Sequence, residues 1–280
     1  MFENFKLTWG EISFHSFHIA VISGIILSFH FNPSKPFESL EIITGLVPYG
    51  ELLRRIHYFS SQIFLLSLLF HKIEYLRKDL PYSISKWAKE VLTIFPLSFL
   101  LLFTGYILRG SKEGIFAHNV AKSLLSSIPL VGKFSGGIIF GDSMFVVFLN
   151  HAVTFTFPMV FLFYWHVRLF YPDYSKFLYV LGITLFTSII FYPSIGHPVD
   201  YPLDPVKGPW FFLGIEELVY HLPPLLGGII FPSVTLLSLS FYRRSPVWRI
   251  TFWILTGFYL ILTIVAGFFR GEGWQISIWR

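Results

Sequence analysis

The sequence has no cysteine among its 280 residues. This absence excludes disulfide bonds, thiolate metal sites and iron–sulfur ligation within the chain. It also excludes covalent attachment of a haem through thioether bonds, because those bonds require cysteine. Any haem bound by this chain must therefore be held without a covalent bond to sulfur.

Charged residues are also scarce. They make up 13% of the chain, whereas a soluble domain has about 25%. The deficit comes from seven long uncharged runs, each close to the roughly 20 residues that a helix needs to cross a bilayer. We therefore predict an all-α integral membrane protein with seven transmembrane helices, because helices satisfy their own backbone hydrogen bonds in lipid. The runs occupy residues 12–31, 56–76, 91–109, 146–171, 176–193, 224–242 and 249–269.

The net charge of +5 does not indicate nucleic-acid binding. Lys and Arg gather at the ends of the apolar runs and in loops, which is usual at membrane surfaces. The first apolar run is as long as the others and lacks a basic lead, so we expect no cleavable signal sequence. The short loops 72–90 and 243–249 favour a cytoplasmic N-terminus.

Two of the apolar runs carry a histidine near each end. The second run contains His57 and His71, fourteen residues apart, and the fourth contains His151 and His166, fifteen apart. Fourteen residues of α-helix turn through about 1400°, close to four whole turns, and rise about 21 Å. Fifteen residues miss a whole number of turns by about 60°, and a kink at Pro158 would adjust the angle. Each helix thus presents two imidazoles on roughly one face.

The second and fourth runs are separated by an even number of crossings, so they run in the same direction. Side by side, they bring His57 level with His151, and His71 level with His166. Two facing imidazoles can ligate a haem iron from both sides, and two haems would carry electrons across the bilayer. The alternative is that the histidines are separate polar residues packed between helices, but two matched pairs favour ligation.

Glycines occur at matching depths in two other runs. Gly10 and Gly24 lie fourteen residues apart, the same step as the first histidine pair, and Gly105 lies near the far surface. A porphyrin edge between helices requires close approach of the backbone, which glycine permits. We therefore include these three glycines in the predicted haem sites.

Three features resemble the cytochrome b subunit of the cytochrome bc family. They are the histidine pairs, the glycine pair and Arg54, which lies three residues before His57. The steps of fourteen and fifteen residues are similar to the plastid-type form. The resemblance extends to three further stretches: FTGYIL at 103–108, SLLSSIPLVG at 123–132 and DYPLDPVKGPWFFLG at 200–214.

The resemblance implies two non-covalent b-type haems. A low-potential haem would lie on His57 and His151. A high-potential haem would lie on His71 and His166. Arg54 would pair with a haem propionate, which suits the geometry of a guanidinium group.

The same resemblance implies two domains and a site for quinol oxidation. Residues 1–172 would form a dihaem four-helix bundle, and residues 173–280 a domain of three further helices. The stretch 123–132 is similar to the family's amphipathic surface helix at the quinol-oxidising site. The stretch 200–214 is similar to the segment that carries the family's Pro-Glu-Trp-Tyr motif, so Trp210 and Phe211 are expected to shape the quinol pocket.

The chain departs from the family within that motif. Alignment of Trp210 with the family's tryptophan places Pro209 where an acidic residue normally takes a proton from quinol. Similar Lys-small-Pro-Trp variants occur in menaquinone-using relatives. Glu216 and Glu217 follow within two helical turns, with His221 near, and we predict that one of these glutamates is the base. The alternative is that both are ordinary polar residues at a helix start.

Two further departures concern haem binding. The extra haem of the plastid-type form needs a cysteine two residues before Gly10, and this position is Thr8. The usual arginine before the second pair of ligands is absent, because position 146 is Val146. One propionate would then have a different partner, for which Lys207 and Arg109 are candidates.

At the opposite surface, a quinone-reducing pocket is expected near His71 and His166. Arg168, Asp173 and Lys176 could pair with the quinone oxygens or relay protons, or could be simple anchors at the membrane interface. Histidines in or near the first run have no matching pattern elsewhere, and we interpret them as packing or quinone-pocket residues: His15, His18 and His30.

These observations favour the cytochrome b subunit of a quinol-oxidising respiratory complex, a quinol:cytochrome c or other acceptor oxidoreductase. Quinone and quinol would be its substrates. The expected partners are a Rieske iron–sulfur protein and a cytochrome c-type subunit, in a homodimeric complex of a bacterial or archaeal cytoplasmic membrane. The alternative is a dihaem membrane anchor that links the quinone pool to a dehydrogenase or reductase without splitting electron pairs. A non-redox transporter or scaffold is a third possibility.

Overall fold

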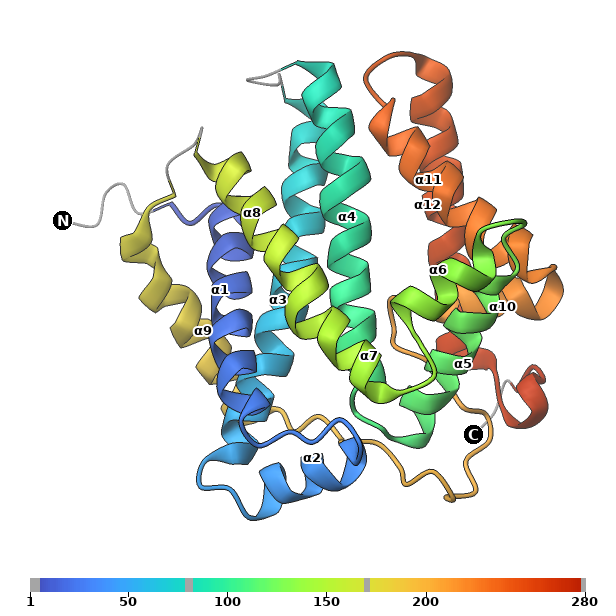
Figure 1. The fold of residues 1–280 in the computed structure, drawn as a ribbon. Coiled ribbons are helices and arrows are strands. Elements are labelled where there is room, and N and C mark those ends of the chain that lie inside the picture. The colour runs from blue at the N-terminus through green and yellow to red at the C-terminus, as the bar shows by residue number, and fades with distance from the viewer. Residues whose placement is uncertain (1–5, 79–82, 169–171, 278–280) are drawn as a thin grey trace. The chain divides into compact units, whose positions relative to one another are not determined.

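A computed structural model describes residues 6–78, 83–168 and 172–277. Every regular element in these ranges is a helix (Figure 1), so the prediction of an all-α protein is confirmed. In chain order they are α1 (Trp9–Ser28), α2 (Pro36–Gly45), α3 (Gly50–Arg77), α4 (Ile84–Ile107), α5 (Lys112–Ser126), α6 (Gly132–Ile139), α7 (Met144–Leu149), η1 (Asn150–Phe155), α8 (Thr156–Val167), η2 (Tyr174–Lys176), α9 (Phe177–Ile190), α10 (Leu213–His221), η3 (Leu225–Ile230), α11 (Phe231–Ser240), α12 (Pro246–Ile264), η4 (Val265–Phe269) and η5 (Glu272–Trp274).

Within the described ranges, four helical segments are long and apolar enough to cross a membrane. The other predicted runs coincide with α3, which carries more charge, and with two shorter apolar segments, Tyr174–Ile190 and Leu225–Ser240. The total of seven transmembrane helices therefore stays a prediction. The four segments are Trp9–Ser28, Ile84–Ile107, Met144–Val167 and Pro246–Phe269.

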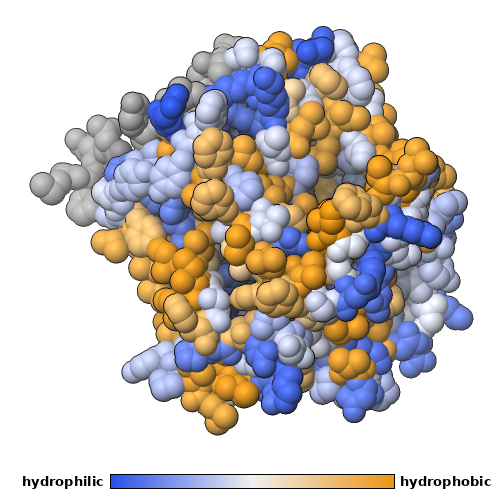
Figure 2. All heavy atoms as spheres, viewed as in Figure 1, coloured by the Kyte–Doolittle hydropathy of each residue, from blue (hydrophilic) through white to orange (hydrophobic). Residues whose placement is uncertain are grey.

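Large hydrophobic side chains are exposed on many of these helices. Phe157, Leu178 and Ile254 are each more than half exposed, and Figure 2 shows hydrophobic residues over much of the face in view. Exposed apolar surface of this extent indicates contact with a membrane or with other proteins. Together with the apolar helices, it identifies a membrane protein.

The chain folds into two compact units that interleave along the sequence. Unit 1 comprises Met1–Pro81, Leu97–Leu102 and Leu149–Ile195, and unit 2 comprises the remainder. Neither unit coincides with residues 1–172 or 173–280, so the predicted domain division remains a prediction.

In unit 1, α1 lies alongside α3, and α9 packs against both (Figure 1). Small polar residues line the contact between α1 and α3: Ser16 and Ser60 are fully buried, and the Ser13 hydroxyl donates to the carbonyl oxygen of Phe64 at 3.4 Å. Small residues let two membrane helices approach closely. The N-terminus of α1 is fixed by a capping box between Thr8 and Glu11.

In unit 2, α10 packs against α12, and α5 packs against α6. The Tyr259 hydroxyl on α12 donates to the carbonyl oxygen of Phe211 at 2.7 Å, which fixes the start of α10. Gly214 makes this approach possible, because a Cβ there would lie 2.5 Å from the Tyr259 ring. These contacts position Glu216 and Glu217 on α10.

Candidate functional site

The four predicted ligand histidines meet in two pairs within unit 1. The ring centroids of His57 and His151 are 6.2 Å apart, with an angle of 77° between the ring planes. The centroids of His71 and His166 are also 6.2 Å apart, at 85°. The structure therefore brings together the residues that helical spacing had matched by depth.

This separation fits a metal ion between the two rings of each pair. A metal–imidazole bond is about 2.0–2.1 Å long, and the bonding nitrogen lies roughly 1.1 Å from the ring centre. Two imidazoles on opposite sides of one metal should thus have centroids roughly 6.3 Å apart. Among the described residues, no group of three His, Asp or Glu side chains could hold a metal alone. Two histidines alone would not complete the coordination of a metal, so a further ligand such as a porphyrin would be needed.

The ring orientation of one pair is fixed by main-chain carbonyl groups. Nδ1 of His57 lies 2.9 Å from the carbonyl oxygen of Ala20, and Nδ1 of His151 lies 3.1 Å from that of Leu101. A carbonyl oxygen only accepts, so each Nδ1 carries the proton and each Nε2 keeps its lone pair. That tautomer leaves Nε2 able to bind a metal, and a hydrogen-bonded Nδ1–H is the usual partner arrangement.

Gly10 and Gly24 lie against the histidines themselves. A Cβ at Gly24 would be 2.9 Å from Cε1 of His57, and a Cβ at Gly10 would be 3.0 Å from Cε1 of His71. The predicted role of these glycines is to permit close approach of a porphyrin edge. In the structure their first neighbours are the imidazoles, which only a residue without a Cβ can accommodate at this distance. Gly105 lies in α4.

The fifteen-residue step between His151 and His166 is corrected by a π-helical turn. η1 (Asn150–Phe155) contains His151, and the Thr156 hydroxyl donates to the His151 carbonyl oxygen, five residues back, at 2.6 Å. A π-turn closes i→i+5 hydrogen bonds and so takes up one extra residue. The remaining residues then turn as fourteen α-helical residues do. The adjustment of angle expected from a kink at Pro158 is thus supplied by the π-turn before it.

Arg54 lies one turn before His57 on α3, and its Nη2 donates to the carbonyl oxygen of Pro193 at 3.1 Å. The guanidinium group is therefore held near the same end of unit 1 as the His57–His151 pair. This placement is compatible with the predicted contact to a propionate.

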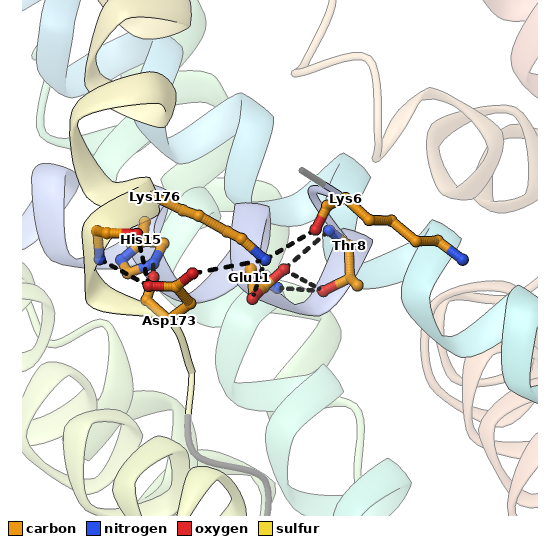
Figure 3. A network of polar contacts seen from close by, with 7 residues as sticks. Lys6, Thr8, Glu11, His15, Asp173 and Lys176 are labelled. Atoms are coloured by element: carbon orange, nitrogen blue, oxygen red, sulfur yellow. Dashed lines mark hydrogen bonds and ion pairs between the residues drawn. The ribbon is translucent and has the colours of Figure 1, made fainter. Parts of the chain in front are cut away.

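Near the other histidine pair, a polar network joins the start of α1 to η2 (Figure 3). The Lys176 ammonium donates to Oε1 of Glu11 at 2.8 Å and to the carbonyl oxygen of Lys6 at 2.7 Å. Nε2 of His15 donates to the carbonyl oxygen of Asp173 at 3.1 Å. The carboxylate of Asp173 accepts from the amide and hydroxyl groups of Ser175. This network holds the segment before α9 against α1.

The remaining polar residues of that region also have protein partners. Nε2 of His18 lies 3.2 Å from the Tyr164 hydroxyl, and the Arg168 guanidinium lies 5.6 Å from the centre of the Trp165 ring. Of the residues expected in a quinone-reducing pocket, Asp173 and Lys176 are thus engaged in packing α1 against η2. His15 and His18 face the same part of unit 1.

In unit 2, the carboxylate of Glu216 lies over the backbone of Gly208. Oε2 accepts from the Gly208 amide at 3.0 Å, and a Cβ at position 208 would overlap Oε1. The side chain is buried. Burial raises the pKa of Glu216 to about 7, against smaller lowering by the Gly208 amide and the charge of Lys207. Glu216 is thus a carboxyl group that titrates near neutral pH beside the motif that lacks an acid.

Glu217 has a different environment. It forms a buried ion pair with Arg270, and its Oε2 accepts from the Trp274 indole at 2.9 Å. Nε2 of His221 lies 3.1 Å from Oε1. Burial alone raises the pKa of Glu217, but the hydrogen bonds from Arg270, His221 and Trp274 outweigh it and lower the pKa. Glu217 therefore fastens the segment after α12 to α10.

The two aromatic residues of the motif differ in exposure. The Phe211 side chain is buried, whereas that of Trp210 is 42% exposed, and the two rings meet edge to face. Lys207 and Arg109, the candidate propionate partners, both line a polar pocket of about 580 Å³ in unit 2. The other lining residues are Tyr106, Glu113, Leu203, Asp204, Pro205 and Gly267.

Two matched histidine pairs between apolar helices are an arrangement that can hold metal centres within the helix bundle of a membrane protein. Residues 3–171 match the family model of cytochrome b/b6/petB, and the chain belongs to this family. It is 26% identical to cytochrome b of Phytophthora megasperma, over 92% of this chain and 81% of that protein. It is 27% identical to cytochrome b of Rickettsia conorii, over 95% and 80%.

A solved structure has the same fold. It is described as a hyperthermophilic respiratory Complex III, and the match has a TM-score of 0.70 over 95% of this chain and 85% of that chain. The sequence identity is 20%, so this likeness concerns the fold. The predicted family resemblance is thereby confirmed from sequence, and the predicted helical architecture has a solved counterpart.

Proposed function

We propose that the chain is the cytochrome b subunit of a quinol-oxidising respiratory complex and holds two non-covalent b-type haems. The observation that carries this proposal is the equal separation of 6.2 Å in both histidine pairs. His57 and His151 would hold one haem, and His71 and His166 the other. When bound, haem supplies a one-electron redox centre whose potential is tuned by burial and hydrogen bonding.

The protein groups around the haems have separate tasks. The carbonyl oxygens of Ala20 and Leu101 hold the Nδ1 atoms of His57 and His151, so that Nε2 of each would be available to bind the iron. Gly24 and Gly10 leave room for the rings of His57 and His71. Arg54 would pair with a propionate, and the role predicted for Gly105 is to leave room for a porphyrin edge. The two haem sites lie fourteen residues apart along α3, about 21 Å.

At one surface, quinol would be oxidised beside Trp210 and Phe211. Glu216 takes a proton from the quinol hydroxyl, because its carboxylate is buried and its pKa of about 7 matches the working pH. Gly208 supports this role, since its amide holds the carboxylate and its missing side chain leaves space for it. The acid that the motif lacks at Pro209 is thus supplied from α10.

Glu217 is the weaker candidate of the two predicted glutamates. A carboxylate held by Arg270, His221 and Trp274 has a lowered pKa and little tendency to accept a proton. Its two carboxylate oxygens already form hydrogen bonds with three protein groups, so neither oxygen is available to a substrate. We assign Glu217 to holding the C-terminal segment on α10.

At the other surface, a quinone would be reduced near His71 and His166. His15 and His18 of α1 would contribute to this pocket, together with Arg168, Asp173 and Lys176. The seven predicted apolar runs would all cross the membrane, with the N-terminus in the cytoplasm. Residues 1–172 and 173–280 would be the family's two domains, in a bacterial or archaeal cytoplasmic membrane.

In this complex one electron from quinol passes to a partner, a Rieske iron–sulfur protein that serves a cytochrome c-type subunit. The other would cross the bilayer through the two haems, and a homodimer is the expected assembly. The non-bifurcating dihaem anchor predicts the same haem sites without a Rieske partner. Oxidant-induced reduction of the haems in the presence of an inhibitor of quinone reduction separates the two functions, because only bifurcation produces it.

The proposal is tested by the haem content of the purified protein. A reduced-minus-oxidised spectrum should show b-type haem at two per chain, and acid–acetone should extract all of it. A stoichiometry near one, or haem left on the denatured polypeptide, would contradict the assignment. A protein without haem would favour the non-redox transporter or scaffold.

A further inference from the structure

The structure assigns Glu113 and His197 to the release of the quinol proton, as a pair that passes it from the pocket beside Lys207 to water. This inference rests on the proposed function, because it begins at Glu216. A buried base that accepts a proton in each turnover must also lose it. Glu216 is only 7% exposed, so this proton needs a defined way out.

Glu113 and His197 are held in one fixed geometry. Nδ1 of His197 lies 2.5 Å from Oε1 of Glu113, and the His197 amide donates to Oε2 at 3.2 Å. The Lys112 amide donates to the His197 carbonyl oxygen at 2.8 Å, and the Tyr201 ring stacks on the imidazole at 4.5 Å. With Nδ1 bound to a carboxylate, Nε2 is the nitrogen that exchanges protons.

Gly196 makes this geometry possible. Its φ of +97° is a conformation that side chains disfavour, and a Cβ there would lie 2.5 Å from Nη2 of Arg109. Glycine therefore lets the segment with His197 approach the N-terminus of α5, where Glu113 lies. The contacts with Glu113, Lys112 and Tyr201 and the requirement for Gly196 thus fix the position of His197, as expected for a functional residue.

A pocket of about 580 Å³ extends from Glu113 of this pair to Lys207, the residue before Gly208. Glu113 and Lys207 both line it, and Lys207 directly precedes Gly208, whose amide holds the Glu216 carboxylate. The Tyr106 hydroxyl, also in the lining, donates to the Lys207 carbonyl oxygen at 3.0 Å. A polar space of this size admits water. His197 is about 40% exposed, so the far end of the route reaches solvent.

The surroundings of the pair keep the Glu113 carboxylate ionised. Burial raises the pKa of Glu113, but hydrogen bonds from His197, Ser111 and the backbone outweigh it and lower the pKa to about 2. Glu113 thus stays ionised and stabilises a protonated imidazole, as carboxylate partners of histidine do. Arg109 and Lys207 balance the charges of Glu113 and Asp204 in the lining of the pocket.

The transfer involves protons only. The quinol O–H bond breaks as the Glu216 carboxylate gains the proton, and Glu216 returns to its ionised form when water in the pocket takes it. Nε2 of His197 then gains the proton from that water, and loses it to bulk solvent. Electrons leave the quinol by the haem and iron–sulfur routes of the proposed function, so the balance of the redox reaction is unchanged.

The test uses the complete, haem-loaded complex with Glu113→Gln and His197→Ala. Each should lower quinol turnover about tenfold, less than the roughly 10²- to 10⁴-fold contribution of a general base because neither group touches the quinol, and increase the solvent isotope effect. Added imidazole should restore turnover in His197→Ala, which a structural defect would not permit. The matched control is Asp142→Asn. It breaks the exposed ion pair between Asp142 and Lys122, a residue of α5 like Glu113, and should change neither turnover nor the isotope effect.

The outcomes separate this inference from the function on which it rests. Unchanged turnover and isotope effect in both variants, or slow turnover that imidazole does not restore, would overturn the role of the pair. Glu216→Gln provides the second comparison. If Glu216→Gln also turns over normally, the oxidation site itself is wrong. If Glu216→Gln alone is slow, the site stands and the proton leaves by another route.

Discussion

The backbone of Gly24 lies against the imidazole of His57, so closely that a Cβ at position 24 would be 2.9 Å from Cε1. Gly10 has the same relationship to His71, with a distance of 3.0 Å. Because α1 and α3 are antiparallel, the equal steps of fourteen residues bring each glycine opposite one histidine. Each histidine pair therefore has its own glycine, and the two pairs can be disturbed separately.

Gly24→Ala should weaken the haem on His57 and His151, and Gly10→Ala the haem on His71 and His166. The added methyl group must push the imidazole away from α1, and overpacking of this kind costs about 1–3 kcal/mol. This corresponds to roughly 5- to 150-fold weaker haem binding. The loss is measured by titration of haem and by the reduced-minus-oxidised spectrum of each variant.

Gly182→Ala on α9 is the matched control, because no atom lies within 4 Å of a Cβ at that position. It should keep both haems at full occupancy. Equal loss of both haems in Gly10→Ala and Gly24→Ala would contradict the assignment of one glycine to each site.

Loss of the ligands should also be selective. His57→Ala and His151→Ala should each remove the same spectral component, because their rings face each other at 6.2 Å. His71→Ala and His166→Ala should remove the other. His30→Ala, outside both pairs, should leave the spectrum unchanged. If His57→Ala and His71→Ala removed one and the same component, the pairing by depth would be wrong.

The π-turn at η1 makes the spacing of the fourth run tolerant of a deletion. Removal of Val153 shortens the step between His151 and His166 to fourteen residues, and a regular α-helix then keeps both rings on one face. Both haems should be retained. Removal of Gln62 from α3, where the step is already fourteen, rotates His57 by about 100° relative to His71 and should abolish one haem site. Haem stoichiometry distinguishes the two deletions.

The positions of the helices could be predicted from the sequence because long apolar runs leave a chain few choices in lipid. The pairing of the histidines followed from helical periodicity, since depth and direction are both set by residue counts. The π-turn could not be found in this way. A fifteen-residue step and Pro158 indicate an irregularity, but they do not say whether the helix bends or takes up a residue.

The candidate oxidation site was harder to predict. Glu216 and Glu217 are neighbours in sequence and equally acidic, so composition and spacing do not distinguish them. Their difference depends on Gly208 and Arg270, which lie 8 and 53 residues away in the chain. Gly208 carried a signal, because a glycine beside the altered motif leaves space for a side chain from elsewhere. Glu113 and His197 are 84 residues apart and gave no such signal.

Glu217→Gln should lower the free energy of unfolding and leave the rate of quinol oxidation by the folded protein unchanged. Removal of one partner from a buried ion pair costs about 3–5 kcal/mol, and the Arg270 guanidinium would be left without its carboxylate. The pKa of Glu217 is lowered in the fold, so its contribution is present above about pH 4.5 and is lost as pH falls through the lowered value. Thermal unfolding monitors this loss. The double variant Glu217→Gln, Arg270→Met should recover part of the stability, because no charge remains buried.

Glu216→Gln should have the opposite signature. The pKa of Glu216 is raised to about 7, so in the native protein quinol turnover should increase as pH rises through about 7 and the carboxylate forms. The variant should lose this rise of turnover with pH. Its rate should fall about 10²- to 10⁴-fold, the usual contribution of a general base.

Because ionisation of this buried group disfavours the fold as pH rises from 4.5 to about 7, the variant should also be more stable than the native protein at pH 8. Full haem content in the variant excludes a general structural defect. Normal turnover with an unchanged pH profile would eliminate Glu216 as the base, and a stability gain at pH 8 would then reflect burial of the carboxyl group alone.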